Sequence, residues 1–347
     1  MDAEEQIPQE EQQEELYERR AFTIDSGQEP MRIDKWLHQR IEGATRNKLQ
    51  QAIEAGFVTV NGFSVKNNYK IKPGDHIVVL SFTNPEYTEV LPEPLPLNIV
   101  YEDAAVMVIN KPPNMVVHPG IGNYTGTLLN GIAYHLMEQK PDLTEDELPR
   151  YGLVHRIDKN TTGLLVLAKT AEAAANLAKQ FFNHTVERKY IALVWGDIAQ
   201  DEGTIVAHVG RHQRLRKMFD AYPEGEHGKH AITHYKVIER FHYVTLVECR
   251  LETGRTHQIR VHMKYIGHTL FNDREYGGDK ILKGTIYSKY KQFVENCFEI
   301  CPRVALHAEI LGFQHPVTKE RILFHEPLPE DMRLVTEKWR NYIRSNM

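Results

Sequence analysis

Between residues 31 and 80, apolar side chains first recur at helical spacing and then in short strand-like runs. The spacing predicts one helix from Met31 onward and a second helix after Thr45, a residue type that often caps helices. An Asn61-Gly62 pair between apolar stretches indicates a tight hairpin. The two helical stripes consist of Ile33, Trp36, Leu37 and Ile41, and of Leu49, Ala52 and Ile53. This region therefore predicts a small helix-helix-hairpin domain.

From residue 98 the pattern changes to many short apolar runs and a few amphipathic segments. One helix is predicted after the cap Thr170, and another over 256–266, where Gly267 closes it. Strands follow strands without a regular helix between them, which predicts an α+β fold with a mostly antiparallel or mixed central sheet and flanking helices. The predicted strands are 105–110, 164–168, 190–195, 204–209, 231–238 and 243–251.

The chain has 347 residues, more than the roughly 250–300 at which one hydrophobic core stops growing. Residues 1–16 contain seven acids and no Lys or Arg, which is typical of a disordered tail. Four prolines in a polar setting indicate a linker at 81–97. We therefore expect a tail at 1–16, a small domain at 17–80, the linker, and a large domain at 98–347.

Charge and cysteine content limit the possible classes of protein. Three cysteines are too few for a disulfide framework, so we expect buried free thiols and a cytoplasmic protein. No apolar run approaches the roughly 18 residues that cross a membrane. The net charge of −5 comes from the acidic tail, and without the tail the chain is slightly basic. A nucleic-acid partner is therefore compatible with the composition.

One carboxylate, Asp158, stands in a polar loop that leads directly into the apolar run 164–168. A carboxylate fixed at the edge of a core can act as a nucleophile or a base if a cation keeps it ionised. Arg260, on the helix predicted over 256–266, is placed to project toward such a loop. An aspartate in a loop is more often a turn former that caps backbone amides. Residue chemistry alone does not decide between these two interpretations.

Five ordered segments resemble the motifs of the RluA-type pseudouridine synthases, and the resemblance covers nearly the whole chain after residue 30. The domain at 31–80 resembles an S4 domain, a small RNA-binding module. Together with the basic stretch 210–231, it is most similar to the branch that modifies large-subunit ribosomal RNA. The segment 270–276 is less typical than its surroundings. The five segments are Tyr101–Gly120, His155–Lys169, Glu187–Ala192, Thr253–His262 and Leu306–Pro316.

The resemblance implies an isomerase that converts uridine to pseudouridine in structured RNA, in a stem-loop of large-subunit (23S-type) ribosomal RNA. It implies that Asp158 is the essential carboxylate, that Tyr190 lies against the flipped base, and that Arg260 pairs with Asp158. It implies no cofactor and no metal, since the reaction needs no redox step or group donor. Substrate contacts are expected from four more residues: Arg156, which would fill the place of the extruded uridine, Ile259, which would pack on the base, His155 and Lys159.

The expected partner is ribosomal RNA, either in the large subunit or in its precursor particle, and the enzyme is expected to act as a monomer. Cations on the two helices of the small domain and in the basic stretch are candidates for phosphate contacts. They are Arg32, Lys35, Arg46, Lys48, Arg211, Arg214, Arg216 and Lys217.

Three other functions were considered. A non-catalytic RNA-binding factor for ribosome assembly could use the same fold, but Asp158, Tyr190 and Arg260 are all present and argue against it. A metallohydrolase is suggested by 18 histidines, yet His257 and His262 are five residues apart, which does not place two ligands squarely on one helical face. The stretch around Asp158 also resembles a kinase catalytic loop, but no glycine-rich phosphate loop precedes it.

Overall fold

The computed structural model describes residues 17–41, 46–54, 58–81, 90–120, 123–143, 149–213, 215 and 218–346. The chain divides into two compact units, one comprising residues 1–90 with 119–124 and the other residues 91–118 with 125–347. The tail expected at 1–16 and the middle of the expected linker lie outside the described residues. The domain limits inferred above stay a prediction.

The first unit pairs two helices with a four-stranded antiparallel sheet of order β1-β4-β2-β3. Asn61 and Gly62 have φ values of 51° and 83°, the left-handed conformation of the tight turn predicted there. Buried Ile33, Trp36 and Leu37 confirm the stripe of the first helix, whereas Thr45 lies outside the described residues. The elements are β1 (Tyr17–Thr23), α1 (Ile33–His38), α2 (Arg46–Glu54), β2 (Val58–Val60), β3 (Phe63–Ser64) and β4 (His76–Ser81).

The second unit is built on a ten-stranded sheet of order β10-β9-β11-β12-β8-β13-β7-β6-β5, with β14 paired to β13. Among these strands only β13 and β7 pair in parallel, so the predicted mixed, mostly antiparallel sheet is confirmed. The strands are β5 (Ile99–Glu102), β6 (Val106–Lys111), β7 (Thr162–Ala168), β8 (Glu187–Trp195), β9 (Glu202–Arg211), β10 (Phe219–Tyr222), β11 (Lys229–Arg240), β12 (Val244–Leu251), β13 (Leu306–Gln314) and β14 (Arg321–His325).

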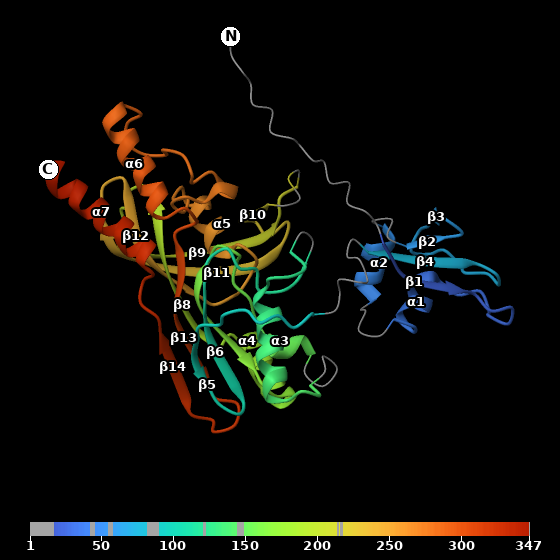
Figure 1. Ribbon diagram of the computed structural model, residues 1–347. Helices are drawn as coiled ribbons and strands as arrows, with labels where there is room; N and C mark the ends of the chain where they lie inside the picture. Colours follow the sequence, from blue (N-terminus) through green and yellow to red (C-terminus); the bar gives the residue numbers. More distant parts are fainter. Residues whose placement is uncertain are drawn as a thin grey trace, which may run out of the picture. The chain divides into compact units, whose positions relative to one another are not determined.

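Helices cover this sheet at separate places (Figure 1). Thr170 caps α4 as predicted, because its side chain accepts a hydrogen bond from Ala173 N. Leu177 of α4 packs with β6, β7 and β13, whereas Val294 of α6 and Trp339 of α7 pack with β8 and β12. The helices are α3 (Leu128–Gln139), α4 (Ala171–Phe182), α5 (Gln258–Tyr265), α6 (Ser288–Ile300) and α7 (Glu330–Asn346), with short 3-10 turns η2 (Pro149–Gly152) and η3 (Arg274–Tyr276).

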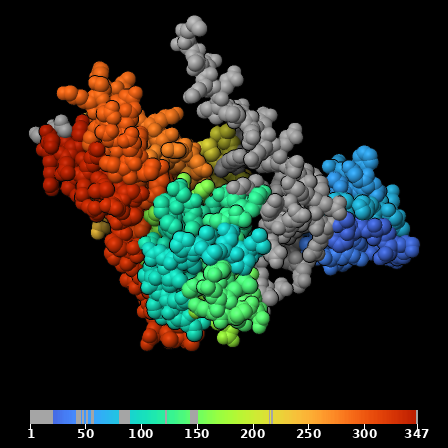
Figure 2. All heavy atoms as spheres, viewed as in Figure 1, coloured from blue at the N-terminus to red at the C-terminus, as the bar shows by residue number. Residues whose placement is uncertain are grey.

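The C-terminal strands return to the beginning of the second unit. Figure 2 shows the teal residues around β5 and β6 beside the red C-terminal residues. His315 Nε2 lies 2.8 Å from Asp103 Oδ2, and the rings of Tyr101 and Phe324 lie 5.3 Å apart. Residues more than 200 positions apart in the sequence are thereby joined on one face.

The helix predicted over 256–266 begins two residues later than expected. His257 has φ = 56°, a left-handed conformation that an α-helix cannot include, so α5 starts at Gln258. Thr256 and His257, the first two residues of the predicted helix, therefore lie outside α5. The other end is as predicted, since Gly267 follows the helix with φ = 86°.

Candidate active site

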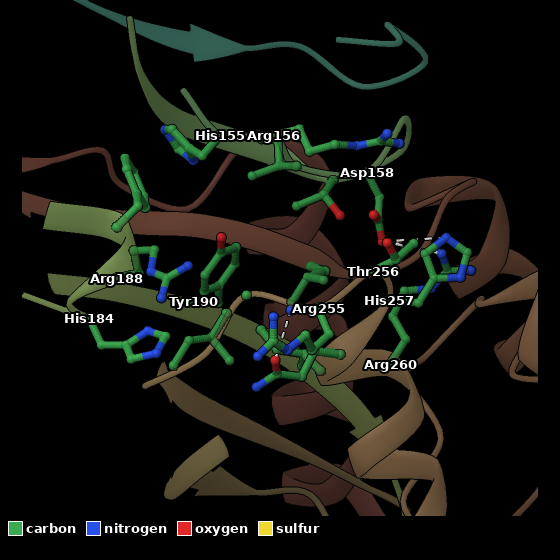
Figure 3. A pocket seen from close by; sticks show the side chains of 18 of the residues that line it. His155, Arg156, Asp158, His184, Arg188, Tyr190, Arg255, Thr256, His257 and Arg260 are labelled. Carbon is green, nitrogen blue, oxygen red and sulfur yellow. Dashed lines mark hydrogen bonds and ion pairs between the residues drawn. The ribbon is translucent and has the colours of Figure 1, made fainter. Parts of the chain in front are cut away.

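A cleft of about 530 Å³ lies where four segments of the second unit converge. The loop before β7, the stretch from the end of α4 into β8, the segment 254–260, and Leu306 at the start of β13 line it (Figure 3). The cleft brings together residues predicted separately from the sequence, namely His155, Arg156, Asp158, Tyr190, Ile259 and Arg260.

Asp158 faces a guanidinium and an imidazole across the cleft. Arg260 Nη1 lies 3.3 Å from Asp158 Oδ2, so the ion pair expected between them is present. His257 Nε2 lies 3.9 Å from the same oxygen. Within the described residues no hydrogen bond or ion pair reaches Asp158 Oδ1, and the Asp158 side chain is 20% exposed. Oδ1 is therefore the carboxylate oxygen open to a ligand.

Arg260 is held mainly by a carboxylate that the sequence analysis did not identify. Its Nε donates a hydrogen bond of 2.7 Å to Asp273 Oδ2, and its Nη2 donates one of 2.7 Å to Asp273 Oδ1. Asp273 is 1% exposed. Nη2 also pairs with Glu275. Burial alone lowers the pKa of Arg260, but Asp273, with Asp158 and Glu275, raises it above its ordinary value. The guanidinium thus stays charged, and Asp273 sets the direction in which Nη1 points.

Two buried cations fix the loop that carries Asp158. Lys111 is 0% exposed and donates to the carbonyl of Lys159 at 2.9 Å, as well as to two carbonyls near its own position. Burial, aided by the charge of Arg303, lowers the pKa of Lys111 to about 7. Arg303 donates to the carbonyl of Asn160 at 3.1 Å. The loop therefore has little freedom on either side of the carboxylate.

Arg303 also links this loop to the C-terminal helix. Its Nη2 donates to Thr162 Oγ1 at 3.2 Å, and its Nε and Nη2 bind the two carboxylate oxygens of Asp331 at 2.7 and 3.0 Å. Gly163, which follows Thr162, has φ = 110°, and a Cβ there would lie 2.2 Å from the carbonyl oxygen of Ala308. Only glycine allows β7 and β13 to approach this closely.

Tyr190 lies on β8 and is 8% exposed. Burial raises the pKa of its phenol, and the charge of Asp158 acts in the same direction while that of Arg188 opposes it. The hydroxyl is therefore protonated at neutral pH. A protonated phenol in the cleft can stack against a planar base or donate a hydrogen bond.

His257 is held by Tyr276, and its neutral form is favoured. Its Nδ1 lies 2.8 Å from Tyr276 Oη, which accepts a hydrogen bond from Phe219 N–H at 3.2 Å. Burial lowers the pKa of His257 although Asp158 opposes the shift. His257 and His262 are the two histidines that a metal site at α5 would use. His262 instead bonds to Thr233 Oγ1 at 2.9 Å, and the described residues contain no group of three potential ligands.

The remaining predicted substrate contacts fall in different surroundings. Arg156 is exposed at the cleft, and Ile259 is buried in its wall. His155 is neutral, because burial lowers its pKa to about 3, and its Nε2 accepts a hydrogen bond from Val166 N. Lys159 is exposed, and the residues that line the cleft do not include it.

Two of the predicted RNA-binding cations hold a buried carboxylate of the first unit. Arg32 and Arg46 both donate to Asp34, which is 0% exposed. These interactions together lower the pKa of Asp34 against the effect of burial. Lys35 lies on α1 and Arg211 ends β9 with its guanidinium 5.6 Å from the ring of Phe219. Arg214, Arg216, Lys217 and the side chain of Lys48 lie outside the described part of the chain.

Several residues of the cleft were not found by sequence reasoning. Arg188 and Arg255 add two cations, and Phe182 adds an aromatic ring that is 82% exposed. Asp273 and Glu275 belong to the segment 270–276, which is less typical of the resembled family than its surroundings. The acids in that segment were the available signal, but their target lies in another element.

Both units of the chain are similar to known proteins. Residues 105–265 match the family model of RNA pseudouridylate synthases, and residues 31–77 match the S4 domain. A protein of Chlorobaculum parvum called an uncharacterized RNA pseudouridine synthase is 48% identical over 320 residues, which cover 92% of this chain and 97% of that protein. The chain belongs to the RNA pseudouridine synthase family. Enzymes of this family are isomerases that convert uridine to pseudouridine in RNA.

Two further proteins are similar to this RNA pseudouridine synthase in sequence or in fold. A ribosomal large subunit pseudouridine synthase D of Vibrio parahaemolyticus is 39% identical over 92% of this chain and 94% of that protein. The solved structure of human RNA pseudouridylate synthase domain containing 4 matches the fold with a TM-score of 0.53 at 22% identity, covering 70% of this chain and 93% of that one. Among the described helices, none combines the length and apolar character needed to cross a membrane.

Proposed function

We propose that the enzyme isomerises uridine in a stem-loop of large-subunit ribosomal RNA, with Asp158 as the essential carboxylate. The observation that carries the proposal is the geometry of Asp158, whose Oδ2 faces Arg260 while Oδ1 is open to the cleft. Support for the substrate comes from the S4 domain and from relatives named for the large ribosomal subunit. The enzyme acts on this RNA in the cytoplasm as a monomer, with an S4-like domain at 17–80 and a catalytic domain at 98–347.

The target uridine has to leave its stack before it reaches Asp158, at a cost of a few kcal/mol. Arg156, exposed at the mouth of the cleft, fills the vacated position with its planar guanidinium. Tyr190 and Ile259 lie against the uracil ring, and Asp158 acts on the ribose so that the bond from C1′ to N1 breaks. The uracil then rotates and rejoins C1′ through its carbon C5, C5 loses its hydrogen as a proton, and N1 takes up a proton in return. The phosphate backbone on both sides stays bound during the rotation.

The decisive experiment replaces the carboxylate with its uncharged isostere. We expect Asp158→Asn to lower the rate of tritium release from RNA labelled at C5 of uridine by at least roughly 10²–10⁴-fold, because the acid–base or nucleophilic group is lost. Asp201→Asn is the control, since Asp201 is 85% exposed and pairs with Arg240 outside the cleft. Unchanged turnover by Asp158→Asn would refute the mechanism and favour a non-catalytic RNA-binding role.

The substrate is tested separately by mapping pseudouridines in ribosomal RNA from a strain that lacks the gene. We expect the loss of pseudouridine in one stem-loop of the large-subunit RNA and its return when the wild-type gene is restored. Intact modification throughout that RNA would remove the substrate assignment while leaving the activity itself in place.

A further inference from the structure

Arg188 is a buried cation in the wall of the cleft. Its residue is 7% exposed, and its Nη2 donates one hydrogen bond of 3.3 Å to the carbonyl of Glu252. Its Nε is buried and has no hydrogen-bond partner within the part of the chain that the structure describes. Burial lowers the pKa of Arg188, and no carboxylate contributes to the shift. The free protein thus holds a charged group away from water without full compensation, which costs free energy.

Two acidic residues near Arg188 bind other groups, namely Glu187, its neighbour in the sequence, and Glu252, whose carbonyl accepts its hydrogen bond. Glu187 alternates to the other side of β8, where its carboxylate binds Arg321 at 2.6 Å. The carboxylate of Glu252 lies 2.6 Å from His234 Nε2. The other buried guanidiniums of the cleft region are satisfied, Arg260 by Asp273 and Arg303 by Asp331. Among the described residues, Arg188 therefore differs from these two in having no carboxylate partner, which leaves its charge available to an anionic ligand.

The surroundings of Arg188 leave its guanidinium accessible to such a ligand. A Cβ at Gly254 would lie 2.7 Å from Arg188 Nη1, so glycine at this position keeps the space beside that nitrogen free of a side chain. The ring of Phe181 lies 5.6 Å from the guanidinium on another side. In Figure 3, Arg188 lies beside Tyr190, on the side away from Asp158. Arg188, Tyr190 and Asp158 all line the cleft, so the three belong to one site.

We propose that Arg188 binds a phosphodiester group of the RNA backbone directly next to the target uridine. This inference rests on the proposed function, because it requires a flipped nucleotide in the cleft. A phosphodiester supplies the full negative charge that a desolvated guanidinium lacks, in a geometry that matches its planar set of donors. A uracil carbonyl accepts a hydrogen bond but leaves the charge uncompensated. Bound in this way, the backbone stays fixed while the uracil rotates over Tyr190.

The first test uses the wild-type enzyme and chemically modified RNA. Two stem-loop RNAs carry one neutral methylphosphonate each, either 5′ or 3′ of the modified uridine, with 2′-fluoro sugars at the nucleotides beside the linkage. A phosphodiester RNA with the same sugars is the reference. We expect one of the two neutral linkages to weaken binding by about 10- to 100-fold, the effect of a lost hydrogen bond to a charged group. Equal affinity for all RNAs would overturn the inference.

The second test asks whether Arg188 is the group that senses the charge. In Arg188→Met the effect of the neutral linkage is expected to disappear, and the slope of log affinity against log salt is expected to fall by about 1. Arg188→Lys keeps the charge and should retain part of the effect. Arg321→Met is the matched control, because its guanidinium pairs with Glu187 outside the cleft, and it should retain the whole effect.

The outcomes separate this inference from the proposed function. If the neutral linkage weakens binding to Arg188→Met as much as binding to the wild type, the phosphate contact is overturned, even if the variant binds RNA weakly. Arg188 then contacts the base or only supports the wall of the cleft. A stem-loop that the wild-type enzyme does not modify refutes the substrate instead. The wild-type measurement with modified RNA stays decisive if a variant fails to fold.

Discussion

Asp273→Asn is expected to damage both the stability and the chemistry of the site, although Asp273 does not line the cleft. Asp273 is 1% exposed and accepts two hydrogen bonds of 2.7 Å from Arg260, whose side chain is 6% exposed. Asparagine keeps the shape but removes the charge and turns an NH2 group toward a guanidinium donor. Asp273 is therefore the main anchor of Arg260, the partner of Asp158.

The magnitude follows from the burial of the pair. Removing one partner of a fully buried ion pair costs about 3–5 kcal/mol. Arg260 would still pair with Asp158 and Glu275, so we expect a smaller loss of about 2–4 kcal/mol in the free energy of unfolding. Freed from Asp273, the guanidinium can close on both oxygens of Asp158. We expect kcat to fall by at least about tenfold, which corresponds to about 1.4 kcal/mol in the barrier.

Urea unfolding in a Trp36→Phe background measures the stability, because Trp195 and Trp339 then report on the second unit alone. Single-turnover tritium release measures the chemistry. Glu275→Gln is the matched control, since the Glu275 side chain is 54% exposed and its pair with Arg260 contributes at most about 1 kcal/mol. If Asp273→Asn is as stable and as active as Glu275→Gln, the reasoning is refuted.

Two further predictions concern acid and a backbone contact. Burial lowers the pKa of His155 to about 3 and that of His262 and His307 to about 4, so between pH 6.5 and about 4 the unfolded chain binds more protons than the folded one. The free energy of unfolding should therefore fall on acidification by up to about 1.4 kcal/mol per pH unit for each histidine, and urea curves that coincide at pH 6.5 and 4.5 would contradict this. Gly163→Ala should lower the free energy of unfolding by about 2–5 kcal/mol in the same assay, because of backbone strain and collision with Ala308. Gly126→Ala is the control and should cost about 1–2 kcal/mol, since Gly126 has φ = 67° but open space around it. Equal losses for the two variants would count against the explanation.

Local pattern was sufficient for much of the fold. The continuous apolar runs of β6, β7 and β8 are typical of strands covered on both faces, and each of these strands is fully or almost fully buried. The Asn61-Gly62 turn and the cap Thr170 were predictable because each depends only on neighbouring residues. The predicted start of α5 was wrong, because His257 adopts a left-handed conformation that the pattern of apolar residues does not indicate.

The candidate site was predictable only in part. Asp158, Tyr190 and Arg260 stand out through the resemblance of their motifs, and the cleft brings them together. Asp273, the dominant partner of Arg260, was not predictable. It lies directly before η3, and no local spacing in the sequence indicates that the chain after α5 turns back toward Arg260. The environment of Arg188 was also hidden. Whether a cation on a strand is compensated depends on the strands beside it, not on its own neighbours.

The Arg303–Asp331 pair has a consequence for how the enzyme becomes active during synthesis. Asn160 lies in the loop that carries Asp158, and its carbonyl accepts a hydrogen bond from Arg303, 143 positions later in the chain. Arg303 is in turn held by Asp331 of α7. A growing polypeptide therefore lacks this support until residue 331 has emerged from the ribosome. Prematurely terminated chains that stop before that residue retain Asp158, Tyr190 and Arg260 but not the anchor of the loop.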